Sequence, residues 1–373
     1  MSEECTARSR PPLTGKALNE HIPIRNSDLK PVSVLVDKCS TLGDCICYLP
    51  ALKALVDWPR AGRITVVTTP FGEPVFANLS PKVDLVVVPW RQTLHAGALV
   101  GWLRVLPRLA FRRYGAALHN HHSQTFAYGL AWALRIPVRI GFDFGMARGN
   151  RLASVRLPLD PAKNVLDLNL EPVRHLTRQP DLRPARVPPW VDANEAVAVR
   201  RQLAEAGVST PYVALHRGAR QAYRRWPYFE ELARRISSDM KLGVVEAPEQ
   251  EVAASPDIIR LPPLSFRAFA ALVAGARAFV GNNSGPMHLA GALGVPTVVL
   301  QGASAENWSF AWPGVSHRSL RVRHLPCVPC EKLGYYPPDC ANLEHPLGCL
   351  RELPVAEALT ALREVLAEEE KKG

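Results

Sequence analysis

Three short polar segments of this chain contain residue types that suit acid–base and phosphate chemistry. Asp44 belongs to the first of them. It closes the polar turn Lys38–Asp44, which follows the apolar run Pro31–Asp37. A carboxylate at the end of a strand can remove a proton from a substrate hydroxyl as a general base. The alternative is an ordinary aspartate that caps the following helix.

A second polar segment, Gly281–Gly285, lies between a short apolar run and a small-residue helix. Ser284 and Gly285 would then lie at the helix N-terminus, where free backbone N–H groups and the helix dipole favour a phosphate. The alternative is an ordinary strand–helix turn. His288 falls four residues after Ser284 on the same helix face. It either reaches the phosphate or belongs to a buried polar network.

A third segment, His216–Pro227, carries four arginines directly after another apolar run. If this loop faces the same cleft as Ser284, then Arg224 or Arg225 would stabilise the negative charge that develops on a diphosphate leaving group. The alternative is a set of surface arginines ahead of a helix.

Four cysteines near the C-terminus have the spacing C-x2-C-x9-C-x8-C: Cys327, Cys330, Cys340 and Cys349. A C-x-x-C pair with two further thiols fits a structural four-thiolate site for zinc or iron. Free thiols and a disulfide are the alternatives. His119, His121 and His122 end another predicted strand, and no carboxylate accompanies them. They are therefore candidates for substrate contact and not for a metal site.

The elements that must position these residues alternate between strand and helix. This alternation predicts an α/β fold with two mostly parallel sheets. The Pro-rich segment 181–190 is predicted to link an N-terminal domain (31–180) to a C-terminal domain (191–352). The C-terminal domain includes the Cys-rich segment 326–350, and a helix over 353–373 follows it. Residues 1–30 are expected to form a disordered leader without a secretory signal, which favours the cytoplasm.

The net charge of +11 is confined to one half of the chain. Residues 1–190 contain 25 Lys and Arg against 14 Asp and Glu, whereas residues 191–373 contain 20 of each. Such an imbalance favours an anionic partner of the N-terminal half, with a solvated basic face as the alternative. No G-x-G-x-x-G follows the first strand and no P-loop motif occurs, so neither common nucleotide cradle is expected. Nucleic acid is not expected as a partner, because motifs for its recognition are absent.

Taken together, four segments resemble glycosyltransferase family 9, the ADP-heptose:lipopolysaccharide heptosyltransferases and their relatives. They are the Gly-Asp turn with its helix, a mid-domain strand, a basic-x-Trp-Pro motif and an Asp-Ser/Thr-Gly-x-x-His signature, found here as Ser40–Leu55, Arg135–Phe142, Arg224–Pro227 and Asn283–Pro296. The resemblance implies the GT-B architecture, in which two Rossmann-like domains face each other across a cleft. It also implies metal-independent inverting transfer from a nucleotide-sugar that the C-terminal domain binds.

The resemblance also implies roles for individual residues. Asp44 falls on the catalytic base, Arg224 on the residue that contacts the donor phosphates, and the donor-binding positions are Asn283, Ser284, Gly285, His288, Thr41 and Gly43. We assign acceptor binding to His121, His122, Arg135 and Arg139. The chain departs from the family pattern twice: Asn283 replaces the signature acid, and Arg224 replaces the commoner lysine.

We therefore expect an inverting glycosyltransferase that moves a sugar, with heptose and ADP favoured, to an anionic glycan such as the lipopolysaccharide inner core. No catalytic cofactor is expected. Peripheral contact with the anionic inner face of the cytoplasmic membrane, through the helix that carries Arg104, Arg108, Arg112 and Arg113, is a further hypothesis. One alternative is a GT-B sugar-nucleotide epimerase or hydrolase. The other is a sugar-nucleotide-binding protein that has lost catalytic activity and contains a structural metal ion.

Overall fold

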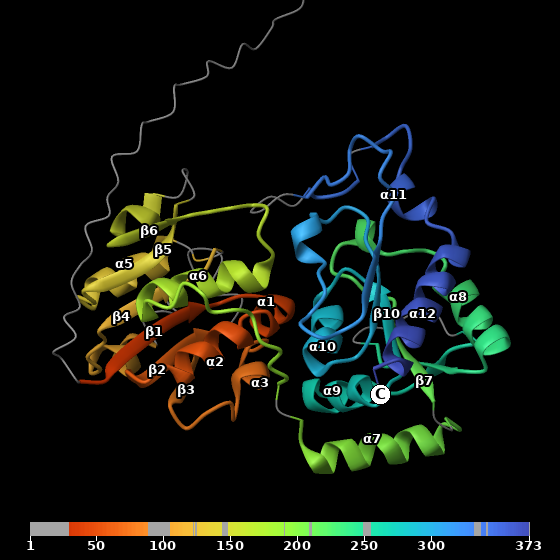
Figure 1. Cartoon of the computed structure of the whole chain (residues 1–373), viewed down its shortest axis with the longest axis horizontal. Coiled ribbons are helices and arrows are strands. Elements are labelled where there is room, and N and C mark those ends of the chain that lie inside the picture. Colours follow the sequence, from red (N-terminus) through yellow and green to blue (C-terminus); the bar gives the residue numbers. More distant parts are fainter. Residues whose placement is uncertain are drawn as a thin grey trace, which may run out of the picture.

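A computed structural model describes most of the chain (Figure 1). The described ranges are 30–88, 105–121, 123, 125–143, 148–189, 191–208, 211–248, 255–331, 337–340 and 342–372. The predicted leader and the first part of the predicted helix Gly97–Tyr114, with Arg104, lie outside these ranges, as does His122.

The N-terminal domain is built on a parallel sheet, six-stranded within the described residues, with the order β3-β2-β1-β4-β5-β6. Its strands are β1 Val32–Lys38, β2 Ala61–Thr68, β3 Val83–Val87, β4 Ala116–His119, β5 Val138–Asp143 and β6 Val155–Pro158. The helical segments are α1 Leu42–Ile46, α2 Leu49–Asp57, α3 Glu73–Phe76, α5 Thr125–Ala133, the 3-10 helix η2 Arg148–Leu152 and α6 Val165–Thr177. Helices α2 and α6 pack on one face of the sheet and α5 on the other.

The C-terminal domain repeats this plan with the order β12-β11-β10-β7-β8-β9, again all parallel. Its strands are β7 Tyr212–His216, β8 Gly243–Glu246, β9 Ile259–Arg260, β10 Ala278–Asn282, β11 Thr297–Leu300 and β12 His317–Leu320. The α-helices are α7 Ala193–Glu205, α8 Phe229–Arg235, α9 Phe266–Ala274, α10 Gly285–Leu293, α11 Gly348–Arg351 and α12 Val355–Glu370. Short 3-10 and π segments are η3 Ala222–Arg224, η4 Ile236–Met240 and η5 Glu306–Trp308.

The predicted α/β class with two Rossmann-like domains is confirmed. The apolar runs Ala116–His119, Tyr212–His216 and Thr297–Leu300 predict strands, and β4, β7 and β11 have these bounds, because each is a short, fully or mostly buried apolar run. The apolar spacing of Cys45–Asp57 predicts a single helix, and this prediction is wrong: α1 ends at Ile46 and α2 begins at Leu49. Pro50 explains the break, since proline lacks the N–H that a continuing helix needs and suits the first turn of a new one.

The two domains meet through the carboxyl ends of their sheets (Figure 1). Helix α1, which follows β1, packs against α10, which follows β10. Residues 178–189 join the domains without forming a helix or strand. Since ligands of parallel α/β sheets bind outside the carboxyl ends of the strands, this contact marks the candidate site. Within the described ranges, no helix has the length and apolar character required to cross a membrane.

Candidate active site

Asp44 lies in the short helix α1, directly after the loop that leaves β1. Its Oδ2 accepts hydrogen bonds from Ser40 Oγ at 2.8 Å and from Thr41 Oγ1 at 2.7 Å. Thr41 is the N-cap residue, yet its hydroxyl binds Asp44 instead of a helix N–H. The turn therefore serves to hold one carboxylate in a fixed orientation at the cleft.

Glycines bring this turn against the C-terminal domain. A Cβ atom on Gly43 would lie 3.0 Å from Gly285 Cα and 3.2 Å from His288 Cδ2. A Cβ atom on Gly285 would lie 3.1 Å from Gly43 N. Only residues without a side chain allow the two backbones to approach this closely. Asp44 thus lies beside the start of α10, although about 240 residues separate them in the sequence.

His288 is part of this junction as a neutral imidazole. Burial lowers its pKa to about 4, and the nearby negative charge of Asp44 opposes that shift only in part. Its ring lies 5.3 Å from that of Phe310, measured between centroids. His288 is therefore suited to neutral hydrogen bonding near Asp44 and not to supplying a positive charge at neutral pH.

Ser284 and Asn282 connect the α10 loop to the arginine loop after β7. Ser284 Oγ lies 3.3 Å from His216 Nδ1 and also contacts the Asn282 carbonyl oxygen at 3.2 Å. The Asn282 side chain accepts from Trp226 N at 2.9 Å and donates to the Arg217 carbonyl oxygen at 2.8 Å. The two loops thus form one hydrogen-bonded unit.

Asn283 occupies the position where the resemblance placed an acid. Its side chain is buried, and its Nδ2 has no hydrogen-bond partner among the described residues. A buried donor without a partner costs free energy unless a ligand or water supplies an acceptor. This amide is therefore suited to hold an oxygen atom of a bound molecule.

Arg224 is not a loose surface arginine. It ends η3, and its Nε and Nη2 donate to Glu331 Oε1 and Oε2 at 2.7 and 2.5 Å. The Glu331 carboxylate is buried and also accepts from the Tyr223 hydroxyl at 2.9 Å. Arg217 likewise pairs with the buried carboxylate of Glu246. The arginine loop is thus built partly from buried ion pairs that the sequence analysis did not foresee.

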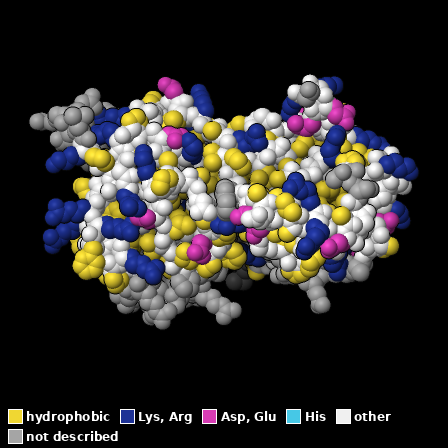
Figure 2. All heavy atoms as spheres, turned by 90° about the horizontal axis from the view of Figure 1, so that it is seen from below, with side chains coloured by type: hydrophobic (Ala, Val, Ile, Leu, Met, Phe, Trp, Pro, Cys, Tyr) yellow, Lys and Arg dark blue, Asp and Glu magenta, His cyan; other side chains and the backbone are white. Residues whose placement is uncertain are grey.

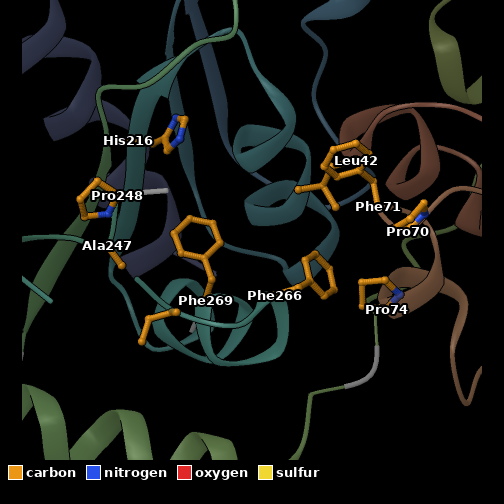
Figure 3. Close-up of a pocket in the computed structure, with 10 residues that line it drawn as sticks. Leu42, Pro70, Phe71, Pro74, His216, Ala247, Pro248, Phe266 and Phe269 are labelled. Carbon is orange, nitrogen blue, oxygen red and sulfur yellow. The ribbon is translucent and has the colours of Figure 1, made fainter. Parts of the chain in front are cut away.

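A cavity of about 260 Å³ lies between the domains near these loops (Figure 3). Its walls are mostly apolar and come from both domains: Leu42, Pro70, Phe71, Pro74, His216, Ala247, Pro248, Leu264, Phe266 and Phe269. Burial lowers the pKa of His216 to about 4, so its ring is neutral near pH 7. The cavity suits a flat, largely apolar group that carries a few polar edges.

The predicted acceptor residues are not all brought to this cleft. His121 is buried just after β4, with its ring centroid 6.4 Å from that of Phe142. Arg135 precedes β5 and is exposed, and Arg139 is the second residue of that strand. The Arg139 guanidinium donates to the carbonyl oxygens of Leu152 and Ile136. Both arginines therefore lie at the amino end of β5, opposite the edge that faces the cleft, because strand direction decides which edge a residue occupies.

The four C-terminal cysteines gather in one segment as free thiols. Burial and the proximity of the other three raise the pKa of Cys349 to about 12. Asn342 Nδ2 lies 3.6 Å from Cys327 Sγ, and Leu347 N lies 3.4 Å from Cys340 Sγ. Within the described ranges, however, no three His, Cys, Asp or Glu side chains are arranged to hold a metal ion. The predicted four-thiolate geometry is therefore not found in this structure.

Basic and apolar side chains share part of the N-terminal domain surface, in the second half of the predicted helix that carries the arginines. Phe111 is 91% exposed, and Arg108, Arg112 and Arg113 beside it are also exposed. Figure 2 shows Lys and Arg side chains along the outer edge of this domain. Arg112 pairs with Asp84, which also pairs with Arg63.

Sequence reasoning missed four residues of the site: Ser40, His216, Asn282 and Glu331. Ser40 and His216 lie next to predicted site residues after strands, a position that could have identified them. Asn282 is adjacent to the signature, and its paired amide atoms suit a bridge between loops. Glu331 lies 107 residues after Arg224, and no local pattern signals their contact.

Comparison with known proteins agrees with this geometry. A family model described as glycosyltransferase family 9 (heptosyltransferase) matches residues 104–335. Lipopolysaccharide heptosyltransferase 1 of Pseudomonas aeruginosa is 30% identical over 322 residues, which cover 80% of this chain and 86% of that protein.

Two solved structures have a similar fold. A glycosyl transferase family 9 protein from Veillonella parvula has a TM-score of 0.73 at 18% identity, covering 91% of this chain and 98% of that chain. The E. coli ADP-heptose lps heptosyltransferase II has a TM-score of 0.66 at 20% identity, covering 91% and 99%. At these identities the likeness shows the two-domain fold alone.

Proposed function

Because the chain belongs to glycosyltransferase family 9 (heptosyltransferase), we propose that it transfers a heptose from ADP-heptose to an anionic glycan of the lipopolysaccharide inner core, with inversion at the anomeric carbon. The observation that carries this proposal is the junction of α1 with α10. At that junction Gly43, which precedes Asp44 in one domain, lies against Gly285 at the N-terminus of α10 in the other, and the buried Asn283 amide comes two residues before Gly285.

The proposed mechanism needs one base and one leaving-group site. Asp44 takes the proton of an acceptor hydroxyl while the oxygen of that hydroxyl attacks the anomeric carbon. The bond from this carbon to the diphosphate oxygen breaks, and ADP leaves with its electron pair. Ser40 and Thr41 hold the carboxylate in position through their two hydrogen bonds. In this mechanism the protein only positions the reactants and stabilises the negative charge that develops on the leaving diphosphate, and no metal ion enters any step.

We assign the leaving diphosphate to the N-terminus of α10 and to Arg224. The backbone N–H groups of Ser284 and Gly285 and the positive end of the helix dipole attract an anion. The buried Asn283 Nδ2 donates a hydrogen bond to a hydroxyl or phosphate oxygen of the nucleotide-sugar. The apolar cavity lined by Phe266 and Phe269 suits the adenine base of the donor (Figure 3). His121 remains the proposed acceptor contact in the N-terminal domain.

Replacing Asp44 with Ala tests the mechanism. We expect the transfer rate to fall by about 10²-fold or more, the usual contribution of a general base, while the affinity for ADP changes little. Transfer is followed on an isolated lipopolysaccharide core acceptor, and ADP binding by calorimetry. Wild-type turnover in the Asp44→Ala enzyme would remove Asp44 from the mechanism.

The same assay separates the alternative activities. Wild-type enzyme incubated with donor alone is expected to release no free sugar, whereas a sugar-nucleotide hydrolase would release it and an epimerase would convert the donor. Donor binding without turnover on any acidic glycan would identify a binding protein.

We propose that the reaction takes place in the cytoplasm at the inner membrane face. The exposed Phe111 with the flanking arginines Arg108, Arg112 and Arg113 supports peripheral contact, since an apolar side chain within a basic patch suits an anionic lipid surface. Vesicles with anionic lipid should retain more protein at low salt than neutral vesicles. Equal retention would exclude the membrane contact.

We also propose that Cys327, Cys330, Cys340 and Cys349 take up zinc or iron as a structural ion. Their shared segment and the N–H groups close to two of the sulfur atoms support this, because thiolates that bind metals commonly accept such bonds. The ion would join the sulfur atoms of the four cysteines and would contact no substrate. Metal analysis of purified protein that finds neither ion would exclude the site.

A further inference from the structure

Glu331 lies in the C-terminal domain and has no role in the mechanism proposed above. Its side chain is 1% exposed, and its backbone N–H donates to the Ala303 carbonyl oxygen at 3.0 Å, just beyond β11. It directly follows Cys330 in the chain. Glu331 is thus fixed at both its backbone and its side chain, within the Cys-rich segment and against the arginine loop.

The pairing of Glu331 with Arg224 is bidentate and specific for arginine. Two parallel N–H···O bonds of 2.7 and 2.5 Å join the Nε–Nη2 edge to both carboxylate oxygens. Only a planar guanidinium offers this fork and still directs further N–H donors elsewhere, since it has five of them. A lysine ammonium is a point charge on a flexible stem and would lie against the carboxylate in no fixed direction.

Tyr223 strengthens the same arrangement. Its buried hydroxyl donates to Glu331 Oε1, and this bond, together with burial, raises the pKa of Tyr223 above its usual range. Trp226, two residues after Arg224, donates its backbone N–H to the Asn282 side chain and its Nε1–H to the Leu353 carbonyl oxygen. The loop is therefore anchored on either side of Arg224, and Glu331 determines where the guanidinium lies.

We propose that Glu331 is a positioning residue for transfer, acting through Arg224. The inference rests on the proposed function, in which Arg224 stabilises the leaving diphosphate. Glu331 itself touches no substrate. It fixes one edge of the guanidinium so that the charge is already in place when negative charge develops on the leaving group.

Kinetics of four proteins test this: wild type, Glu331→Gln, Arg224→Lys and the double variant. We expect Glu331→Gln to lower kcat by about tenfold or more, because a misplaced catalytic group loses its effect. The KM for the donor should change by less than about threefold, since the contact matters mainly in the transition state. The kcat of the double variant should be at most about twofold lower than that of Arg224→Lys, because the free-energy effects of coupled residues do not add.

A matched control is Glu368→Gln, which removes a carboxylate from the Arg318 pair of the same domain, on α12 away from the cleft. It should retain wild-type kcat. Wild-type kcat in Glu331→Gln, or losses that multiply in the double variant, would overturn the proposal. A merely structural role would lower thermal stability and kcat together in both single variants and would produce multiplied losses.

If Glu331→Gln fails to fold, Tyr223→Phe and Arg224→Lys decide the matter. Tyr223→Phe removes one hydrogen bond to Glu331 and should lower kcat by about two- to fivefold, the size expected for a single bond. Arg224→Lys should lower it by about tenfold or more. Unchanged kcat in either variant overturns the proposal. Wild-type protein that neither binds ADP nor transfers a sugar would instead refute the proposed function.

Discussion

Asn282 and Asn283 are neighbours with opposite roles in the free protein. Asn282 makes its side-chain hydrogen bonds to Trp226, Arg217 and Gly218 within the protein. Asn283 is equally buried, but its Nδ2 lacks a partner among the described residues. The first residue therefore stabilises the fold, whereas the amide of the second is the donor that we propose binds a ligand.

Substitution of each asparagine by alanine should separate these roles. Asn283→Ala should leave the melting temperature unchanged or slightly raised, because it removes a buried donor that costs about 1–3 kcal/mol when unsatisfied. The donor KM should rise by about 2- to 13-fold, the equivalent of one lost hydrogen bond of about 0.5–1.5 kcal/mol. Asn282→Ala should instead lower the melting temperature. A melting temperature that falls equally in both variants would contradict this assignment.

At the scale of elements, the contact between α1 and α10 depends on two glycines, Gly43 and Gly285. Their backbones approach closely enough that a Cβ atom on either would press against the other. The spacing between the turn that carries Asp44 and the N-terminus of α10 is thus set by two residues without side chains.

Gly43→Ala should widen this contact. We expect the transfer rate to fall by about tenfold or more, since a displacement near 1 Å can cost that much, with only a small change in melting temperature. Gly129→Ala in α5 is the control, because a Cβ there meets no atom within 4 Å. That variant should keep full activity and gain about 0.5–1 kcal/mol of stability from the better helix former. Equal activity of the two variants would show that the α1–α10 distance is not critical.

Across the whole molecule, several histidines with buried or half-buried side chains make the fold sensitive to acid. Burial lowers the pKa of His119 to about 3 and those of His216, His288 and His317 to about 4, against an ordinary value of 6.5. The unfolded chain binds protons at these groups before the folded protein does. Their contribution to stability is therefore complete above about pH 6.5 and is lost as the pH falls toward the folded pKa values.

His119→Phe should reduce this acid sensitivity. His119 is 2% exposed, stacks on Tyr128 with ring centroids 4.0 Å apart, and makes no hydrogen bond through either ring nitrogen to any residue that the structure describes. Phenylalanine keeps the stacked ring and removes the titrating group. Denaturant unfolding should show that the variant loses up to about 3 kcal/mol less stability than wild type between pH 7 and pH 4. Parallel losses in both proteins would show that His119 titrates normally in the folded state.

Some elements were missed at sequence level for identifiable reasons. Helix α6 contains Pro172, which normally argues against a continuous helix, yet burial of residues such as Val173 and Leu176 against the sheet overrides that preference. Strands β6 and β12 have polar sequences, VRLP and HRSL, and lie at the outer edges of their sheets. Edge strands need not be apolar on both faces, so their sequences give a weak signal.

The sequence by itself determined the features that depend on neighbours in the chain. Apolar runs followed by small polar turns specified the parallel α/β halves, the Asp44 turn and the start of a helix at Ser284 and Gly285, because these follow from local spacing. Only the tertiary structure decided what distant segments do to one another. It paired Arg224 with Glu331, joined Ser284 to His216, and directed Arg139 toward backbone carbonyl groups away from the cleft. Those outcomes depend on strand order and on where loops meet, which no local pattern contains.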